Sequence, residues 1–404
     1  MSVASRAGVV LSQIVGGSAG ISVLAVVLAL LVGAILIALT DSGVQQAAGY
    51  FFARPGDTFA AVGDAVGGAY SALFRGAIYN TRVDSFASQI KPITDTLTFA
   101  TPLIAAGLGV ALAFRVGLFN IGAQGQILIG ALFSGFVASK LELPIVIHLI
   151  VALLAGIAGG ALWGGIAGFL RARTGAHEVI VTIMLNYVAA NLLFYLLKTP
   201  VLQASGSTNP KSGAIASTAE LPQLLGEGFQ LHLGFILVIA ATVLVWWLLN
   251  RSALGFRFRA VGENAQAARV AGMDVGNLYL VAMLLSGALA GLAATDQVLG
   301  GSLTSGFGST VDAGIGFDAI TVALLGRSRP LGVFLAGLLF GALKAGGYTM
   351  QASEGVPIDI VLVVQSLIVL FIAAPPLVRA VFRLPVPKPG PGVRGAEPKA
   401  VVSK

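Results

Sequence analysis

Long apolar runs separated by short polar segments dominate the chain from residue 21 to residue 375. Most of these runs approach about 20 residues, the length of an α-helix that crosses the ~30 Å hydrocarbon core of a bilayer. The pattern therefore predicts an all-α fold, a polytopic transmembrane helical bundle of about ten spans. The predicted spans cover residues 21–39, 93–114, 118–139, 143–169, 177–197, 231–250, 277–300, 316–326, 331–350 and 357–375.

The run at 316–326 is too short for a full span, because eleven helical residues cover only about 16 Å. A glycine- and serine-rich segment precedes it. At membrane depth, irregular backbone is tolerated only where it is buried in protein or lines a wet cavity. We therefore expect a short, broken helix here. In the span at 143–169, glycines recur every fourth residue and predict a close-packed helix face: Gly156, Gly160, Gly164 and Gly168.

Composition along the chain predicts three parts. Residues 1–92 contain an N-terminal anchor helix, retained rather than cleaved, and an external amphipathic segment around residues 59–79. Residues 93–376 form the transmembrane core. Residues 377–404 are rich in proline, glycine and basic side chains, a composition typical of a disordered tail.

The basic residues are distributed unevenly between the two sides of the predicted bundle. Threading ten spans from an inside N-terminus places sixteen of the 24 Lys and Arg residues inside and seven outside, with Lys344 within a span. Because cytoplasmic loops carry an excess of Lys and Arg, this distribution predicts a multi-pass protein of the plasma membrane with both termini cytoplasmic. It also explains the net charge of +7 without nucleic acid as a partner.

Composition excludes several classes of protein. The chain is 56% hydrophobic and only 10% charged, whereas soluble domains are about 25% charged. It has no cysteine and three histidines, which leaves little scope for a metal site. No Gly-x-x-x-x-Gly-Lys-[Ser/Thr] motif is present to hold a nucleotide phosphate, and no triad or ligand spacing indicates an enzyme. We expect no cofactor in this chain, so energy must come from a partner or from an ion gradient.

Polar side chains within the predicted spans are candidates for a solute pathway, because such groups must face protein or water. Glu178, Thr182 and Asn186 recur at steps of four and share one helix face. Amides also serve uncharged solutes, since they donate and accept hydrogen bonds. The alternative for each residue is a hydrogen bond that joins neighbouring helices. The candidate pathway residues are Phe119, Asn120, Gln124, Gln126, Glu178, Thr182, Asn186 and Asp318.

Residues 251–276 form the longest polar interruption of the second half and include four arginines. From Asn264 to Val270 the composition favours a short helix, with a small apolar face at Ala267, Ala268 and Ala271, and Gly272 is a typical helix end. The alternative is an ordinary basic loop on the cytoplasmic side.

Several motifs, in order from about residue 70 to residue 375, resemble those of permease subunits of ATP-binding-cassette importers in the nucleoside, simple-sugar and branched-chain amino-acid group. They begin at Gly117 (Gly-Leu-Phe-Asn-Ile-Gly-Ala-Gln-Gly-Gln), Glu178 (Glu-Val-Ile-Val-Thr-Ile-Met-Leu-Asn-Tyr), Arg259 (Arg-Ala-Val-Gly-Glu-Asn) and Gly316 (Gly-Phe-Asp-Ala-Ile-Thr). Gln124 stands where nucleoside permeases of this class have glutamate.

This resemblance implies a permease for nucleosides, with simple sugars as an alternative solute. It implies cytoplasmic ATP-binding subunits, a second permease subunit in a homo- or heterodimer, and an extracytoplasmic solute-binding lipoprotein. The 251–276 segment would then be a cytoplasmic coupling helix docked on the ATPase through Arg259, Gly262, Glu263, Asn264, Ala267, Ala268, Ala271 and Gly272. An ion-coupled secondary transporter is the remaining alternative, although carboxylates deep in the core are few.

Overall fold

The computed structural model describes residues 18–204, 206, 208–226, 228–301 and 305–383. These residues form helices and connecting segments, with two isolated β-bridges, Gln203↔Ser212 and Gln223↔His232. The helices are α2 (Ser18–Thr40), α3 (Ser42–Ala48), α4 (Pro55–Ala77), α5 (Phe86–Arg115), α6 (Ala123–Lys140), α7 (Ile145–Thr174), α8 (Glu178–Leu196), η1 (Ser217–Ala219), α9 (Gly234–Arg251), α10 (Ala253–Glu263), α11 (Ala265–Val270), α12 (Val275–Leu299), α13 (Ile315–Leu325), α14 (Pro330–Glu354), α15 (Ile358–Ala373) and α16 (Pro375–Val381).

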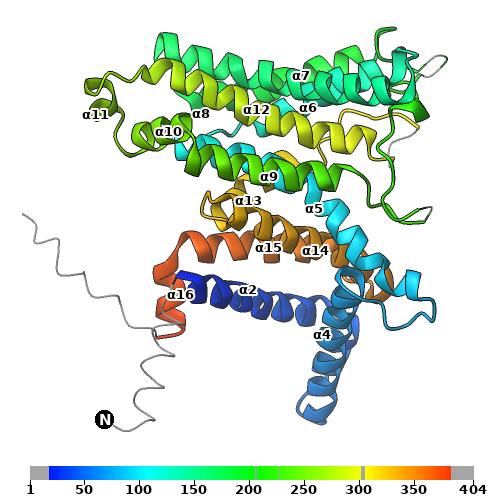
Figure 1. Ribbon diagram of the computed structural model, residues 1–404. Coiled ribbons are helices and arrows are strands. Elements are labelled where there is room, and N and C mark those ends of the chain that lie inside the picture. Colours follow the sequence, from blue (N-terminus) through cyan, green and yellow to red (C-terminus); the bar gives the residue numbers. More distant parts are fainter. Residues whose placement is uncertain (1–17, 205, 207, 227, 302–304, 384–404) are drawn as a thin grey trace, which may run out of the picture.

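Each of the ten predicted apolar runs corresponds to one of the described helices, which confirms the polytopic helical bundle. Seven of them, α2, α5, α7, α8, α9, α12 and α14, are long and apolar enough to cross a membrane. The apolar helices α13 and α15 are shorter, and α6 is the tenth. In Figure 1 the long helices lie roughly side by side, while α4 runs across one end of the bundle.

Glycines allow the central helices to approach closely. A Cβ atom added to Gly160 of α7 would collide with the backbone of Gly287 and Gly291 of α12, and one on Gly164 would collide with Met283 of the same helix. The close-packed face predicted for α7 is therefore confirmed. On the other side of the core, Gly337 of α14 meets Ile104 of α5 in the same way.

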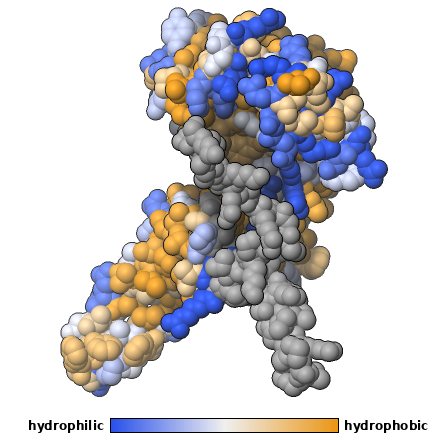
Figure 2. Space-filling view, turned by 90° about the vertical axis from the view of Figure 1, so that its left-hand side faces the viewer, coloured by the Kyte–Doolittle hydropathy of each residue, from blue (hydrophilic) through white to orange (hydrophobic). Residues whose placement is uncertain are grey.

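The connecting segments gather at two ends of the bundle. At one end lie α10, α11, α16 and the turns that follow α5 and α13, and we call it the α11 end (Figure 1). Polar residues cover much of the upper part of this end in Figure 2. The opposite end, the α4 end, carries α4 and the described residues of the connections 197–233 and 300–314.

Three boundaries differ from the prediction. The span expected at 118–139 begins as a helix only at Ala123, because Gly117 has φ 80° and the backbone through Gly122 is irregular. Helix α5 begins at Phe86 and crosses the expected division between residues 92 and 93. Residues 377–381 belong to α16 rather than to a disordered tail, and residues 384–404 lie outside the described part of the chain.

Candidate functional site

Three polar side chains in the bundle, Asn120, Gln126 and Ser286, form one hydrogen-bonded group, and a fourth, Asn186, bonds the adjacent backbone. We call these four residues the polar brace. Asn120 is fully buried, and its Nδ2 donates to Gln126 Oε1 (3.1 Å) and to Ser286 Oγ (2.8 Å). Its Oδ1 accepts from the backbone N–H of Gly122 (2.9 Å) and from Gln126 Nε2 (3.3 Å). Ser286 in turn donates to Gly109 O of α5 (2.7 Å). The group therefore ties α5, α6 and α12 to the irregular backbone between α5 and α6.

Asn186 of α8 completes the polar brace from the other side. Its Oδ1 accepts from the backbone N–H of Gly125 (2.8 Å), and its Nδ2 donates to Ile121 O (2.9 Å). These two bonds satisfy backbone groups at the start of α6, which have no hydrogen-bond partner within the helix itself. Asn186 thus holds α8 against the start of α6.

Glu178, Thr182 and Phe119 surround the polar brace toward the α11 end. The Glu178 carboxylate lies 3.4 Å from Arg171 Nε and accepts from the backbone N–H of Phe119 (3.4 Å). Thr182 is buried and donates to Glu178 O within α8 (2.8 Å). Phe119 is 41% exposed and stacks on Phe114 with ring centroids 4.8 Å apart. The structure brings all three together beside Asn120.

The hydrogen bonds of the polar brace are those expected of side chains that join helices, the alternative considered from the sequence. Asn120, Gln126 and Asn186 are buried and each is bonded to protein. A pathway role for these residues stays a prediction.

Gln124 and Asp318 do not join the brace. Gln124 hydrogen-bonds Asp312, and its backbone touches Gly316, so the first turns of α6 and α13 meet there. Lys344 lies close enough to Asp312 and Asp318 to attract both electrostatically.

A cavity of about 420 Å³ lies near the α4 end, between α5, α12, α13 and α14 and the segment before α9. We call it the polar cavity. Its volume falls within the range of about 300–1,000 Å³ typical of small-molecule sites. Two aromatic rings, Phe99 and Tyr348, line it and pack against each other with centroids 5.6 Å apart. Its other polar lining residues are Thr98, Gln223, Gln230, His232, Asp296, Gln297 and Lys344.

His232 and Asp296 form a buried pair in the wall of the polar cavity, with Nδ1 and Oδ1 3.6 Å apart. This separation would suit an ion pair, but burial lowers the pKa of His232 to about 4. In addition, the backbone N–H of Gly234 donates to Nδ1 (3.3 Å). The imidazole is therefore neutral near pH 7 and leaves Asp296 Oδ1 without a hydrogen-bond partner. Buried polar atoms without a partner are uncommon.

The predicted short helix of the 251–276 segment is present as α11, and a second helix, α10, precedes it. Asn264 caps α11, since its Oδ1 accepts from the N–H groups of Gln266 and Ala267 (3.0 Å each). Gly272, with φ 83°, follows the end of α11. The predicted apolar face is divided, because Ala268 is buried while Ala267 and Ala271 are exposed. Glu263 is also exposed, and Arg259 is half-buried.

Gly262 connects this segment to the bundle. A Cβ atom at Gly262 would collide with the carbonyl group of Arg115, at the end of α5, and Gly117 lies directly beside it. Residues 116–122, which the polar brace holds, begin at this contact. The α10–α11 segment is therefore in backbone contact with the part of the chain that joins α5 to α6.

Sequence reasoning missed Ser286 and most of the polar cavity. Ser286 stands in a run of small residues that reads as ordinary helix packing. Phe99, Gln230 and Tyr348 come from three distant segments and belong to no recognisable motif. The one available signal was Asp296, a carboxylate in an otherwise apolar run.

Comparison with known proteins gives consistent matches. A family model described as "Branched-chain amino acid transport system / permease component" matches residues 92–373. The guanosine ABC transporter permease protein NupP of Bacillus subtilis is 39% identical over 79% of this chain and 89% of its own length. The glucose ABC transporter permease protein TsgB13 of Haloferax volcanii is 39% identical over 72% of this chain and 78% of its own length. The nucleoside ABC transporter permease protein NupB of Lactococcus lactis is 34% identical over 72% of this chain and 82% of its own length. No solved structure matches significantly.

Proposed function

The chain belongs to the branched-chain amino acid transport system permease family, and from this premise we propose that it is the transmembrane subunit of an ATP-driven importer of nucleosides. Two of the relatives described above are named for guanosine or nucleoside transport and one for glucose. The partners we propose are cytoplasmic ATP-binding subunits, a second permease subunit and an extracytoplasmic solute-binding lipoprotein.

The observation that carries this proposal is the exposed α10–α11 segment and its contact with the end of α5. Movement of an ATPase bound to α11 would pass through Gly262 to residues 115–122. The polar brace joins that stretch to α6, α8 and α12, so the three helices would move with it. Conversion of a local movement into a shift of packed helices is a common form of conformational switching.

The polar cavity supports a nucleoside as the solute. The rings of Phe99 and Tyr348 offer surfaces for stacking on a base, an interaction worth about 1–3 kcal/mol per base. The amide groups of Gln223, Gln230 and Gln297 can pair with polar atoms of a base, and the carboxyl group of Asp296 in the cavity wall can accept a hydrogen bond from a ribose hydroxyl.

The orientation we propose places the α11 end in the cytoplasm. Arginines of five segments lie there: Arg115, Arg171, Arg173, Arg251, Arg257, Arg259, Arg269, Arg327, Arg329, Arg379 and Arg383. An excess of basic residues is the usual mark of the cytoplasmic side. The polar cavity would then lie toward the outside, where a solute-binding lipoprotein delivers its cargo, and both termini would be cytoplasmic.

The experiment is uptake of labelled guanosine and glucose into vesicles that contain the permease with and without its ATPase subunit. We expect ATP-dependent guanosine uptake that Gly262→Asp abolishes, because the new side chain displaces α10 from the carbonyl of Arg115. Gly67→Asp on α4 is the control, since its added side chain meets open space. Undiminished uptake without the ATPase would reject the proposal, and uptake of glucose alone would reject the nucleoside.

A further inference from the structure

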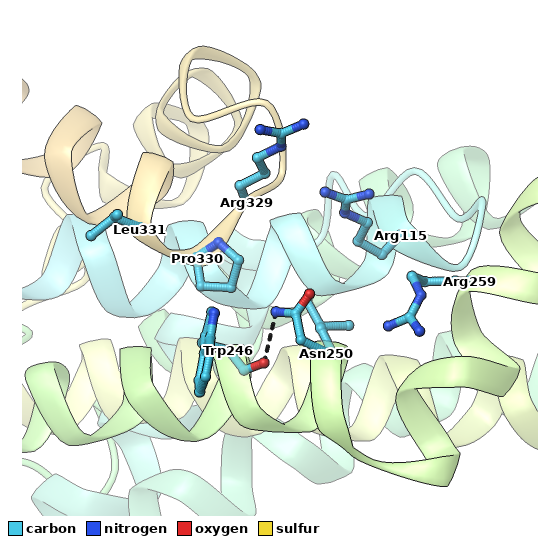
Figure 3. A pocket seen from close by; sticks show the side chains of 8 residues that line it. Arg115, Trp246, Asn250, Arg259, Arg329, Pro330 and Leu331 are labelled. Atoms are coloured by element: carbon cyan, nitrogen blue, oxygen red, sulfur yellow. Dashed lines mark hydrogen bonds between the residues drawn. The ribbon is translucent and has the colours of Figure 1, made fainter.

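A groove of about 400 Å³ lies at the α11 end, between the last turn of α9, the start of α14 and the end of α5 (Figure 3). We call it the arginine groove. Arg115, Arg259 and Arg329 lie around its upper and right-hand part in Figure 3, each from a different segment. Trp246, Leu249, Pro330 and Leu331 supply its apolar walls.

The three arginines lack acidic partners within the part of the chain that the structure describes. Arg115 Nε donates to the carbonyl of Ser328 (2.9 Å), but this bond leaves its charge uncompensated. Arg259 Nη1 is buried without any hydrogen-bond partner. Among the described residues, none of these three arginines forms an ion pair with an acidic side chain, and no carboxylate lines the groove. Three positive charges around one hollow favour an anion with several acceptor oxygens.

The apolar walls indicate that this anion carries a hydrocarbon chain. Trp246 and Leu331 are 44% and 65% exposed, on helices that are long and apolar enough to cross a bilayer. Trp246 lies about one turn before the end of α9, and Leu331 is the second residue of α14, so both are near one boundary of the spans. Tryptophan is enriched at that boundary, beside lipid headgroups. A free phosphate ion could bind to the arginines, but it would gain no favourable contact with these apolar side chains.

We propose that the arginine groove binds the headgroup phosphate of an anionic phospholipid, with an acyl chain lying along Trp246 and Leu331. Basic pockets between transmembrane helices on the cytoplasmic side suit such headgroups. The bound lipid would join α5, α10 and α14 through Arg115, Arg259 and Arg329. Because Arg259 belongs to α10, the lipid would also steady the segment that we propose docks on the ATPase. This inference depends on the membrane placement of the chain and not on the identity of its solute.

The test uses fluorescence of Trp246 in nanodiscs. The chain has three tryptophans, so Trp163→Phe with Trp247→Phe leaves Trp246 as the sole emitter. Brominated phosphatidylglycerol in a phosphatidylcholine matrix should quench Trp246 to the same extent as brominated phosphatidylcholine at a mole fraction at least about fivefold lower. Each basic residue near a membrane surface strengthens the binding of anionic lipid by about fivefold. Arg329→Gln should weaken this preference by about fivefold. The exposed Arg173→Gln at the same end is the matched control and should leave it unchanged.

Three results would overturn the proposal. Equal quenching by the two brominated lipids would show that the groove has no preference for an anionic headgroup. Relief of quenching by millimolar inorganic phosphate would assign the arginines to a soluble anion. Unchanged lipid preference in Arg329→Gln, together with loss of ATPase copurification, would assign them to a protein contact. The quenching needs neither solute nor ATPase, so its failure is distinguishable from failure of the transport proposal.

Discussion

The polar brace and the polar cavity both place polar side chains inside an apolar bundle, but they differ in how those side chains are satisfied. In the brace, Asn120 and Asn186 are bonded to neighbouring side chains and to backbone groups. In the cavity, Asp296 lines about 420 Å³ of open space, and its buried Oδ1 has no hydrogen-bond partner among the described residues. A satisfied buried group stabilises the fold, whereas an unsatisfied group beside a cavity is available to a ligand. We therefore assign mechanical support to the brace and solute binding to the cavity.

The largest expected effect comes from breaking the brace with Asn120→Ala. The substitution removes the partners of the Gly122 N–H, Gln126 and Ser286. Leaving several buried polar groups unpaired should lower the free energy of unfolding by roughly 2–4 kcal/mol. Thermal unfolding in detergent measures this change. An unchanged melting temperature together with loss of guanosine uptake would contradict the role of Asn120 in the brace. Asn120 would then contact the solute, as the sequence predicts for a pathway residue.

The second effect separates the two regions by pH, because the cavity contains a buried histidine and the brace contains none. The pKa of His232 is about 4 in the folded protein, below its ordinary value of about 6.5. Between these pH values the histidine binds more protons in the unfolded chain than in the folded chain. Its contribution to the free energy of unfolding therefore rises with pH and is fully present above about pH 6.5. At pH 5 the loss contributed by His232 is about 2 kcal/mol. When the pH is lowered from 7.5 to 5, the melting temperature of His232→Gln should fall less than that of the unsubstituted chain, or should rise. An equal difference in both would refute this assignment.

The third effect concerns Asp296, the unpartnered acid of the cavity. Asp296→Asn should weaken guanosine binding by up to about tenfold, because it loses a hydrogen bond to the carboxyl group worth roughly 0.5–1.5 kcal/mol. It should leave the melting temperature unchanged or raise it, since a buried carboxylate without a partner is costly. Titration of guanosine against the purified permease measures the first quantity. A clear loss of stability with unchanged binding would make Asp296 a structural residue like Asn120.

The smallest effect is expected at the aromatic pair. Tyr348→Leu removes one ring that faces Phe99 and should weaken guanosine binding about fivefold, near the lower end of measured stacking energies. Tyr348→Phe keeps the ring and is the matched control. A similar loss in both variants would show that the hydroxyl group, rather than stacking, contributes.

The sequence predicts the bundle and its glycine contacts because both depend on one-dimensional patterns. Hydropathy locates the spans, and four-residue spacing locates the face of Gly156 and Gly160. Asn264 and Gly272 likewise mark the ends of α11 through local backbone chemistry. Partner choice is different, since Asn120 bonds Ser286, which is 166 residues away. Whether a polar residue is satisfied depends on the rotation and depth of several helices, which hydropathy leaves undetermined. For that reason the sequence predicts that Asn120 and Asn186 face inward, but it does not predict the polar cavity.

The most direct test of the division between brace and cavity uses the absence of cysteine from the chain. Single cysteines are placed at Gln297 in the polar cavity and at Thr182, which is buried beside the brace. The rate of modification by a membrane-impermeant thiol reagent is then measured with and without guanosine. The account predicts that Gln297→Cys reacts and is protected by guanosine, whereas Thr182→Cys stays unmodified. Protection by guanosine at Thr182→Cys, with none at Gln297→Cys, would contradict it.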